Sequence, residues 1–509
     1  MKIKFENLQL AVAAGSVRPI QGGFLLSGSK VALLHPFGYT QFYRHGYHSW
    51  SLSAWLALDH PLPRPVLEHL WPHCDDPDLM PDYPFSGSAV GALQGQDGNI
   101  LLLGALSLGA RVQADPQVLR GVYDLQATPG VQRSEENPAE PTQEGWQDFE
   151  WFLAYDPEQA AFSRYAELLK QRLGTRELGP APRVWCSWYG LYTDIREDLL
   201  LETLQGLSGM PFEVFQVDDG WQQRIGDWEA NAKFPSGMLA LAENIRRSGF
   251  TPGLWLAPFI VQPDSHLFQQ HPEWIVRDEY GQPALAGENW GGAFYALDLT
   301  HPQVQEWLVE TIQKIRAWGF DYLKLDFLYA ANLPGKRYQP WPRRTIFRHG
   351  LGLVREAAGE QAYLLTCGAP VLASIGLADG MRIGPDVAPY WDNPDRSRYL
   401  HDFTGPAALN AIRTSLQRLW LRPLIHTDPD VVFFRERYNL LTPQERNYLR
   451  DLAFLAGFKA TSDLPVWLDE GERRALKAFL EADPHIERLD RYRFRIDQKI
   501  VDFGFSQKL

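Results

Sequence analysis

The chain has 509 residues, more than one domain of average size, so we expect a large core with accessory units. Its formal net charge is −13, from 49 basic and 62 acidic residues, which argues against nucleic acid and anionic membranes as partners. No stretch approaches the ~18–20 apolar residues of a membrane span. The cysteines, Cys74, Cys186 and Cys367, are too scattered for a disulfide framework or a zinc site, so we expect reduced thiols.

The first part of the chain, residues 1–175, is predicted to form an antiparallel β-sandwich. Short apolar runs such as 31–38 and 99–113 are broken by Gly, Pro, Asn and Asp, which is typical of strands joined by turns. The opening MKIKFENLQLAVAAGS indicates a strand rather than an export signal, because Glu6 and Asn7 interrupt its apolar stretch. A cytoplasmic location is therefore expected. A helix over 158–173 and a Gly/Pro linker end this part.

Residues 176–482 alternate short apolar runs with amphipathic helical patterns, which predicts repeated βα units. Eight candidate strands make a (β/α)8 TIM barrel the expected fold, with a doubly wound α/β sheet as the alternative. Helices are predicted over 302–318, which opens at Pro302, and after the capping box of Thr442 and Glu445. Residues 483–509 are predicted to add a short β appendage. The candidate strands span 183–190, 212–219, 251–259, 321–327, 362–368, 381–386, 423–428 and 456–462.

Polar and aromatic residues follow these strands at their carboxyl ends, where the loops of a barrel converge on one mouth. Hydroxyl-rich neutral sugars need many donors and acceptors, and glycoside cleavage needs two carboxyl groups. Aromatic rings also suit the apolar face of a sugar. The predicted site needs no metal or cofactor, and it holds Trp188, Tyr189, Asp218, Asp219, Trp221, Trp255, Lys324, Asp326, Cys367, Arg382 and Asp386.

Asp326 stands out because it lies in the otherwise apolar strand DYLKLDFLY. With a period of two, Lys324 and Asp326 are expected to face the barrel mouth while Phe327 packs against the helices. A nearby lysine keeps a carboxylate ionised, as a nucleophile requires. The alternative is a Lys–Asp ion pair that only closes the barrel.

Asp386 follows the sixth strand in MRIGPDVAPYW, where Tyr390 and Trp391 are expected to shield a general acid. A turn-capping aspartate is the alternative, and Asp428 and Asp430 are rivals after the seventh strand. Adjacent carboxylates at Asp218 and Asp219 suggest binding of ligand hydroxyls, or else a loop cap. A tryptophan on an apolar strand is more often a core residue than a ligand contact. The alternation of the strand nevertheless places Trp255 among the residues that face the barrel interior.

Together these strings resemble the α-galactosidases of glycoside hydrolase family 36 over nearly the whole chain. The specific pieces are HGYHSWS (45–51), WCSWYG (185–190), FQVDDGWQ (215–222), GLWLAPF (253–259), YLKLDF (322–327) and MRIGPDVAPYW (381–391). The resemblance implies a retaining enzyme that acts on terminal α-galactosyl residues through a covalent intermediate, with Asp326 as nucleophile and Asp386 as acid/base. It also implies that Asp218 and Asp219 hold the galactose 4- and 6-hydroxyls.

By the same resemblance, Lys324, Cys367 and Arg382 line the hydroxyl side of the sugar, while Trp188, Tyr189, Trp221 and Trp255 form walls and Trp50 reaches in from the sandwich. Family members usually end in a longer β-domain, whereas 27 residues follow position 482, as in the compact subgroup. A monomer or a small homo-oligomer is expected. Small α-galactosides such as melibiose or raffinose are the expected ligands.

Three alternatives stay open from the sequence. A relative that transfers galactose to sugars, such as raffinose or stachyose synthase, would carry similar motifs. An α-N-acetylgalactosaminidase is less favoured, because Cys367 is expected to crowd a 2-acetamido group. A non-catalytic sugar-binding protein explains the aromatic residues but does not need both Asp326 and Asp386.

Overall fold

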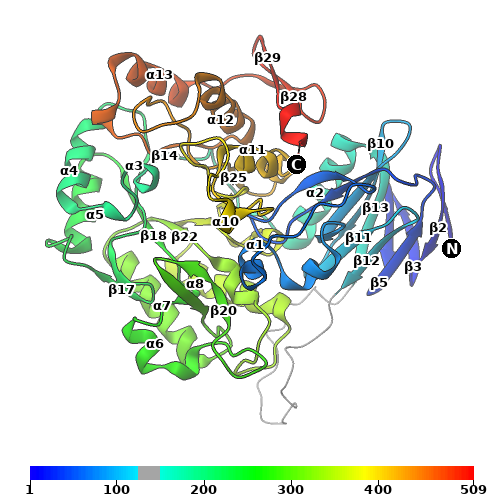
Figure 1. Ribbon diagram of the computed structural model, residues 1–509, viewed down its shortest axis with the longest axis horizontal. Helices are drawn as coiled ribbons and strands as arrows, with labels where there is room; N and C mark the ends of the chain where they lie inside the picture. The colour runs from blue at the N-terminus through cyan, green and yellow to red at the C-terminus, as the bar shows by residue number, and fades with distance from the viewer. Residues whose placement is uncertain (124–148, 509) are drawn as a thin grey trace.

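The protein consists of two stacked sheets beside a barrel, with a small sheet near the C-terminus (Figure 1). A computed structural model describes residues 1–123 and 149–508. Part of the region predicted as a sandwich, residues 124–148, lies outside this description. The boundaries proposed at residues 175 and 482 stay predictions.

The amino-terminal region forms two antiparallel sheets, as predicted. The first contains, in spatial order, β1 (Lys2–Lys4), β2 (Gln9–Ala13), β5 (Lys30–Leu34), β12 (Val118–Tyr123), β11 (Ala110–Ala114) and β8 (Ser86–Ser88). The second contains β3 (Ser16–Ile20), β4 (Gly23–Ser27), β13 (Glu150–Pro157), β10 (Asn99–Ala105), β9 (Val90–Gln94), β6 (Gln41–Arg44) and β7 (Ala54–Ala57).

Strand β10 explains why this part of the sequence lacks polar alternation. Its Leu101 and Leu103 pack into the core between the two sheets, whereas Ile100 and Leu102 point to the other face and join the core shared with the barrel. Helix α2 (Glu158–Leu173) covers that second face. Because both faces are buried, the strand is apolar at nearly every position.

Eight parallel strands form the barrel and confirm the predicted fold. Their order along the sheet follows the chain, and the last strand pairs with the first. A single parallel bridge between Val432 and Thr461 joins the remaining edge, so the barrel is nearly closed and the doubly wound alternative is excluded. The strands are β14 (Arg183–Cys186), β15 (Val214–Val217), β18 (Thr251–Leu256), β22 (Tyr322–Leu325), β23 (Tyr363–Thr366), β24 (Gly380–Arg382), β25 (His426–Asp428) and β26 (Lys459–Thr461).

Helices surround the barrel and begin where the sequence predicts. Helix α7 (Pro302–Ala317) has proline at its first position, and α12 (Pro443–Ala456) starts with the capping box of Thr442 and Glu445. Among the described residues, no helix has both the length and the apolar character that a membrane span requires. The other long helices are α4 (Glu197–Gly206), α5 (Gly237–Arg247), α8 (Arg343–Ala358), α11 (Ala408–Leu416) and α13 (Glu470–Glu481).

The segment 45–51 of the amino-terminal region is held against the barrel by a buried arginine. The guanidinium of Arg418 donates to the carbonyls of Gly46, His48, Ser49 and Ser51, and also to that of Ile383 beyond β24. No side-chain carboxylate is among these partners, so backbone dipoles solvate the charge. This contact network places segment 45–51 beside the loop that follows the sixth barrel strand.

The C-terminal sheet agrees with the predicted appendage and consists of β27 (Ile486–Arg488), β28 (Arg493–Ile496) and β29 (Lys499–Asp502). The residues after β29 lie next to α11 (Figure 1). Phe505 packs on Trp391 with ring centroids 5.3 Å apart. This appendage therefore supports the loop that carries Asp386.

Candidate active site

A cavity of about 280 Å³ opens at the carboxyl ends of the barrel strands. Most of the predicted site residues line it, which the topology rule for parallel barrels anticipates. The predicted residues in its wall are Trp50, Trp188, Tyr189, Asp218, Asp219, Trp255, Lys324, Asp326 and Asp386.

Three predicted site residues do not line this cavity. Trp221 is fully buried behind Trp255, to whose carbonyl its indole N–H donates at 2.8 Å. Cys367 is also fully buried, and Arg382 lies beneath Asp386. These side chains support the cavity wall from behind.

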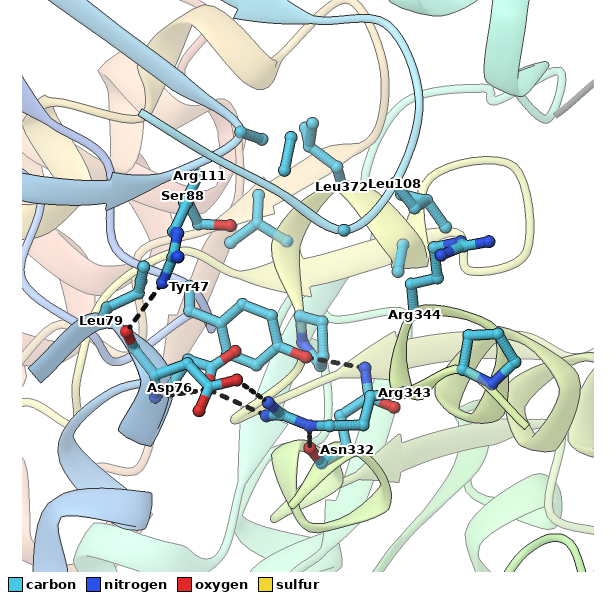
Figure 2. Close-up of a pocket in the computed structure, with 18 residues that line it drawn as sticks. Tyr47, Asp76, Leu79, Ser88, Leu108, Arg111, Asn332, Arg343, Arg344 and Leu372 are labelled. Carbon is cyan, nitrogen blue, oxygen red and sulfur yellow. Dashed lines mark hydrogen bonds and ion pairs between the residues drawn. The ribbon is translucent and has the colours of Figure 1, made fainter. Parts of the chain in front are cut away.

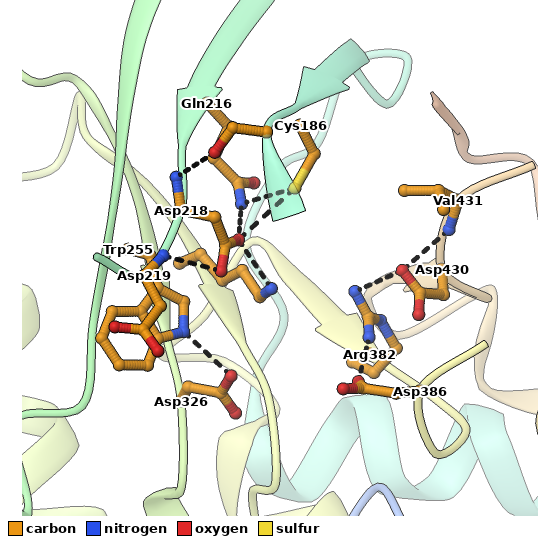
Figure 3. Close-up of polar contacts among 12 residues, drawn as sticks. Cys186, Gln216, Asp218, Asp219, Trp255, Asp326, Arg382, Asp386, Asp430 and Val431 are labelled. Atoms are coloured by element: carbon orange, nitrogen blue, oxygen red, sulfur yellow. Dashed lines mark hydrogen bonds and ion pairs between the residues drawn. The ribbon is translucent and has the colours of Figure 1, made fainter. Parts of the chain in front are cut away.

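Asp326 immediately follows β22 and reaches the cavity as predicted (Figure 3). The indole N–H of Trp255 donates to its Oδ2 at 3.0 Å, and the backbone N–H of Phe327 donates to its Oδ1 at 2.9 Å. Both donors stabilise negative charge on the carboxylate. The arrangement suits a nucleophile that must stay ionised.

Lys324 lines the cavity together with Asp326, as predicted, but its ion-pair partner is a different aspartate. The Lys324 ammonium forms a buried ion pair of 2.9 Å with Asp218 on the neighbouring strand. Although burial opposes its charge, Asp218 holds the pKa of Lys324 well above the ordinary value. The indole of Trp255, not the lysine, is the side-chain donor to Asp326.

Phe327 also departs from its expected position. The strand ends at Leu325, and Phe327 adopts a left-handed conformation with φ of 54°, which turns its ring into the cavity wall. There it packs on Trp50 and Trp290, with centroid separations of 5.2 and 5.3 Å. The period-two pattern no longer applies because the strand has ended.

The neighbouring carboxylates Asp218 and Asp219 are held by different donors. Besides Lys324, Asp218 Oδ2 accepts from Gln216. Asp219 accepts from Gln222 and from the indole N–H of Trp290, each at 2.6 Å. Burial, together with the nearby charge of Asp218, raises the pKa of Asp219 to about 6.

Asp386 lies in the loop after β24 with its side chain 34% exposed to the cavity. Arg382 Nη1 donates to its Oδ1 at 3.0 Å (Figure 3). Burial in the cavity and the negative charge of Asp430 outweigh this contact and raise the pKa of Asp386 to about 7. A carboxyl group that keeps its proton near neutral pH can act as a general acid.

The two rivals of Asp386 are buried away from the cavity. Asp428 and Asp430 are 2% and 1% exposed, and both contact the guanidinium of Arg382, at 3.0 and 2.9 Å. Of the two aromatic residues expected to shield Asp386, Tyr390 lines the cavity, whereas Trp391 packs on the C-terminal segment. Only Asp386 of the three carboxyls faces the space where a ligand would lie.

Sequence reasoning missed the loops that narrow the cavity. Trp290 lies at the turn between β20 (Leu285–Asn289) and β21 (Gly292–Ala296), and His73 belongs to the short helix α1 (Trp71–Cys74). Arg398, in α10 (Arg396–Tyr399), donates to the carbonyl of Glu288 and bridges two of these loops. The tryptophan within Glu-Asn-Trp-Gly-Gly was the only available signal, because loop shape is not periodic.

A second hollow, of about 90 Å³, lies where the amino-terminal sheets meet α8 (Figure 2). In its wall, Arg343 forms ion pairs with both Asp76 and Asp78. The larger cavity with its several carboxyls is the better candidate site. Within the described part of the chain, no three His, Cys, Asp or Glu side chains form a metal-binding group.

Comparisons with known proteins find similarity to α-galactosidases. The Melibiase family model matches residues 159–355. The chain is 48% identical to TtGalA, an α-galactosidase from Thermus thermophilus, whose structure with p-nitrophenyl α-D-galactopyranoside superposes with a TM-score of 0.90 over 99% of each chain. Another structure of that protein contains stachyose.

Curated relatives match over shorter segments. The α-galactosidase AgaA of Geobacillus stearothermophilus is 29% identical over 38% of this chain and 27% of its own length. An α-galactosidase of Escherichia coli is 27% identical over 33% of this chain and 25% of its own length. The matched segments thus span about a quarter of these two relatives.

Proposed function

We propose that this chain, which belongs to the α-galactosidases of glycoside hydrolase family 36, hydrolyses terminal α-galactosyl residues with retention of configuration. The observation that carries the proposal is that Asp326 and Asp386 line one cavity in different environments. Two N–H donors stabilise charge on Asp326, whereas the pKa of Asp386 is raised to about 7. Such a divergence distinguishes a nucleophile from an acid.

In the first step, the Asp326 carboxylate attacks C1 of the galactosyl group and the glycosidic C1–O bond breaks. The departing oxygen takes the proton of Asp386. In the second step, water attacks C1, Asp386 accepts the proton from that water, and the bond to Asp326 breaks. The products are free galactose and the former leaving group, and both carboxyls return to their initial states.

The substrate class follows from the lining and from the Thermus relative. Asp218, Asp219 and Lys324 offer acceptors and a donor for sugar hydroxyls, while Trp50, Trp188, Tyr189 and Trp255 provide apolar walls. Complexes of that relative with an aryl α-galactoside and with stachyose support small α-1,6-galactosides such as melibiose or raffinose. The proposed exclusion of 2-acetamido sugars gains no support from Cys367, which lies behind the wall.

The decisive experiment replaces Asp326 by alanine. Turnover of an aryl α-galactoside should fall by at least ~10³-fold, because no nucleophile remains. Wild-type turnover in Asp326→Ala would refute the assignment. For the wild type, NMR of the first sugar released should show the α-anomer, and a β-anomer would contradict retention. Product analysis with excess sucrose separates hydrolysis, which releases galactose, from galactosyl transfer.

A further inference from the structure

Asp430 lies outside the cavity but contacts the elements that hold Asp386 (Figure 3). We propose that Asp430 is a positioning residue that orients Asp386 and keeps it available as a proton donor. The inference rests on the proposed function, since it assumes that Asp386 protonates the leaving group.

Each oxygen of the Asp430 carboxylate has two donors. Oδ2 accepts the backbone N–H of Val387 at 2.9 Å and the hydroxyl of Tyr189. Oδ1 accepts from Val431 N–H at 2.8 Å and lies 2.9 Å from Arg382 Nη2. One buried side chain thus joins the residue after Asp386, the arginine beneath it and a tyrosine of the cavity wall.

The backbone of Asp430 is held in an unusual conformation. Its φ is 80°, and its N–H donates to Asp428 Oδ1 at 2.8 Å. Left-handed backbone is sterically disfavoured at a residue other than glycine, so it persists only where surrounding contacts determine it. In this conformation the Asp430 carboxylate contacts the backbone of the loop that carries Asp386, at Val387.

The charges around Asp386 link the position of its carboxyl group to its affinity for a proton. Arg382 is the cation in contact with Asp386, but it also contacts Asp428 and Asp430. Two buried carboxylates therefore share the charge that would otherwise favour ionised Asp386. In line with this geometry, Asp430 is the charged neighbour that most raises the pKa of Asp386. The titratable and charged groups facing Asp386 are Arg382, Asp430, Lys324, Asp326, Cys367, Tyr189, Tyr192 and Tyr390.

The test is Asp430→Asn in the full chain. The side-chain amide of asparagine has one acceptor oxygen, so either the N–H of Val387 or the guanidinium of Arg382 loses its acceptor. The negative charge at position 430 is also lost. A sugar leaving group needs protonation, whereas a nitrophenolate leaves without it. At neutral pH we expect kcat for melibiose to fall at least ~10-fold more than kcat for p-nitrophenyl α-galactoside. The alkaline limb of kcat/KM should also move about one pH unit lower, because less repulsion favours ionised Asp386.

Asp428→Asn is the matched control. This variant also removes one negative charge that contacts Arg382. Asp428, however, accepts hydrogen bonds from Arg382 and from the backbone of Asp430, whereas the N–H of Val387 donates to Asp430. A clearly smaller shift of the alkaline limb supports the role of Asp430. Equal shifts in the two variants would overturn it, since any charge beside Arg382 would then suffice.

If Asp430→Asn does not fold, Tyr189→Phe provides the test, because it keeps the ring and removes only the hydroxyl that donates to Asp430. A selective loss on melibiose supports the proposal, and equal losses on both substrates with an unmoved alkaline limb contradict it. Failure of the proposed function is distinguishable, because the wild type would then not cleave the aryl galactoside or Asp326→Ala would keep its turnover.

Discussion

Replacing Asp386 by asparagine is expected to stabilise the folded protein at alkaline pH while it abolishes cleavage of sugar leaving groups. The pKa of Asp386 is raised from the ordinary 3.8 to about 7, chiefly by burial. Between these pH values the folded chain keeps a proton that the unfolded chain has released. The free energy of unfolding therefore falls as the pH rises through this interval, and the full cost is present above about pH 7.

The magnitude follows from the same interval. At about 1.4 kcal/mol per pH unit, a difference of roughly three units corresponds to ~4 kcal/mol. The side chain is 34% exposed, so solvent screening reduces this figure, and we expect ~1–2 kcal/mol. The asparagine oxygen can still accept from Arg382, so the variant loses the cost of the charge and keeps a hydrogen bond.

Urea unfolding of the wild type and Asp386→Asn, measured near pH 5 and near pH 8.5, provides the assay. The variant should gain stability over the wild type mainly at the higher pH. Asp392→Asn makes the same exchange at an exposed position of the same loop and should change stability by less than ~0.5 kcal/mol at both pH values. An Asp386→Asn variant with no pH-dependent advantage would refute the reasoning.

Two further predictions concern the contacts that place Trp50. Gly368 has a φ of 55°, and a Cβ added in Gly368→Ala would lie 2.9 Å from the Trp50 ring. We expect the free energy of unfolding to fall by ~1–3 kcal/mol and the KM for aryl galactosides to rise. An unchanged KM would contradict this role of the contact. Arg418→Met removes the donors to five backbone carbonyls and should cost ~3–5 kcal/mol by urea unfolding, whereas a cost below ~1 kcal/mol would show that water replaces the guanidinium.

The barrel could be predicted from the sequence because its signals are local. Apolar runs of strand length, helical periodicity, the proline at Pro302 and the capping box at Thr442 each act within a few residues. Once eight parallel strands are assigned, the topology itself brings their carboxyl ends to one mouth. Topology alone therefore predicts that Asp326 and Asp386 reach the same cavity, and both line it.

The pairing of side chains was decided only by the tertiary structure. Lys324 lies two residues from Asp326, yet its ion pair is with Asp218, 106 positions away in the chain. Three carboxyl groups lie at or after the ends of the sixth and seventh strands. Asp386 faces the cavity, whereas Asp428 and Asp430 are buried and contact Arg382. The turn of Phe327 and the loop of Trp290 likewise follow from packing between distant segments. Local patterns determine which elements form, whereas partners across strands and loops depend on register and close packing, which no short stretch of sequence contains.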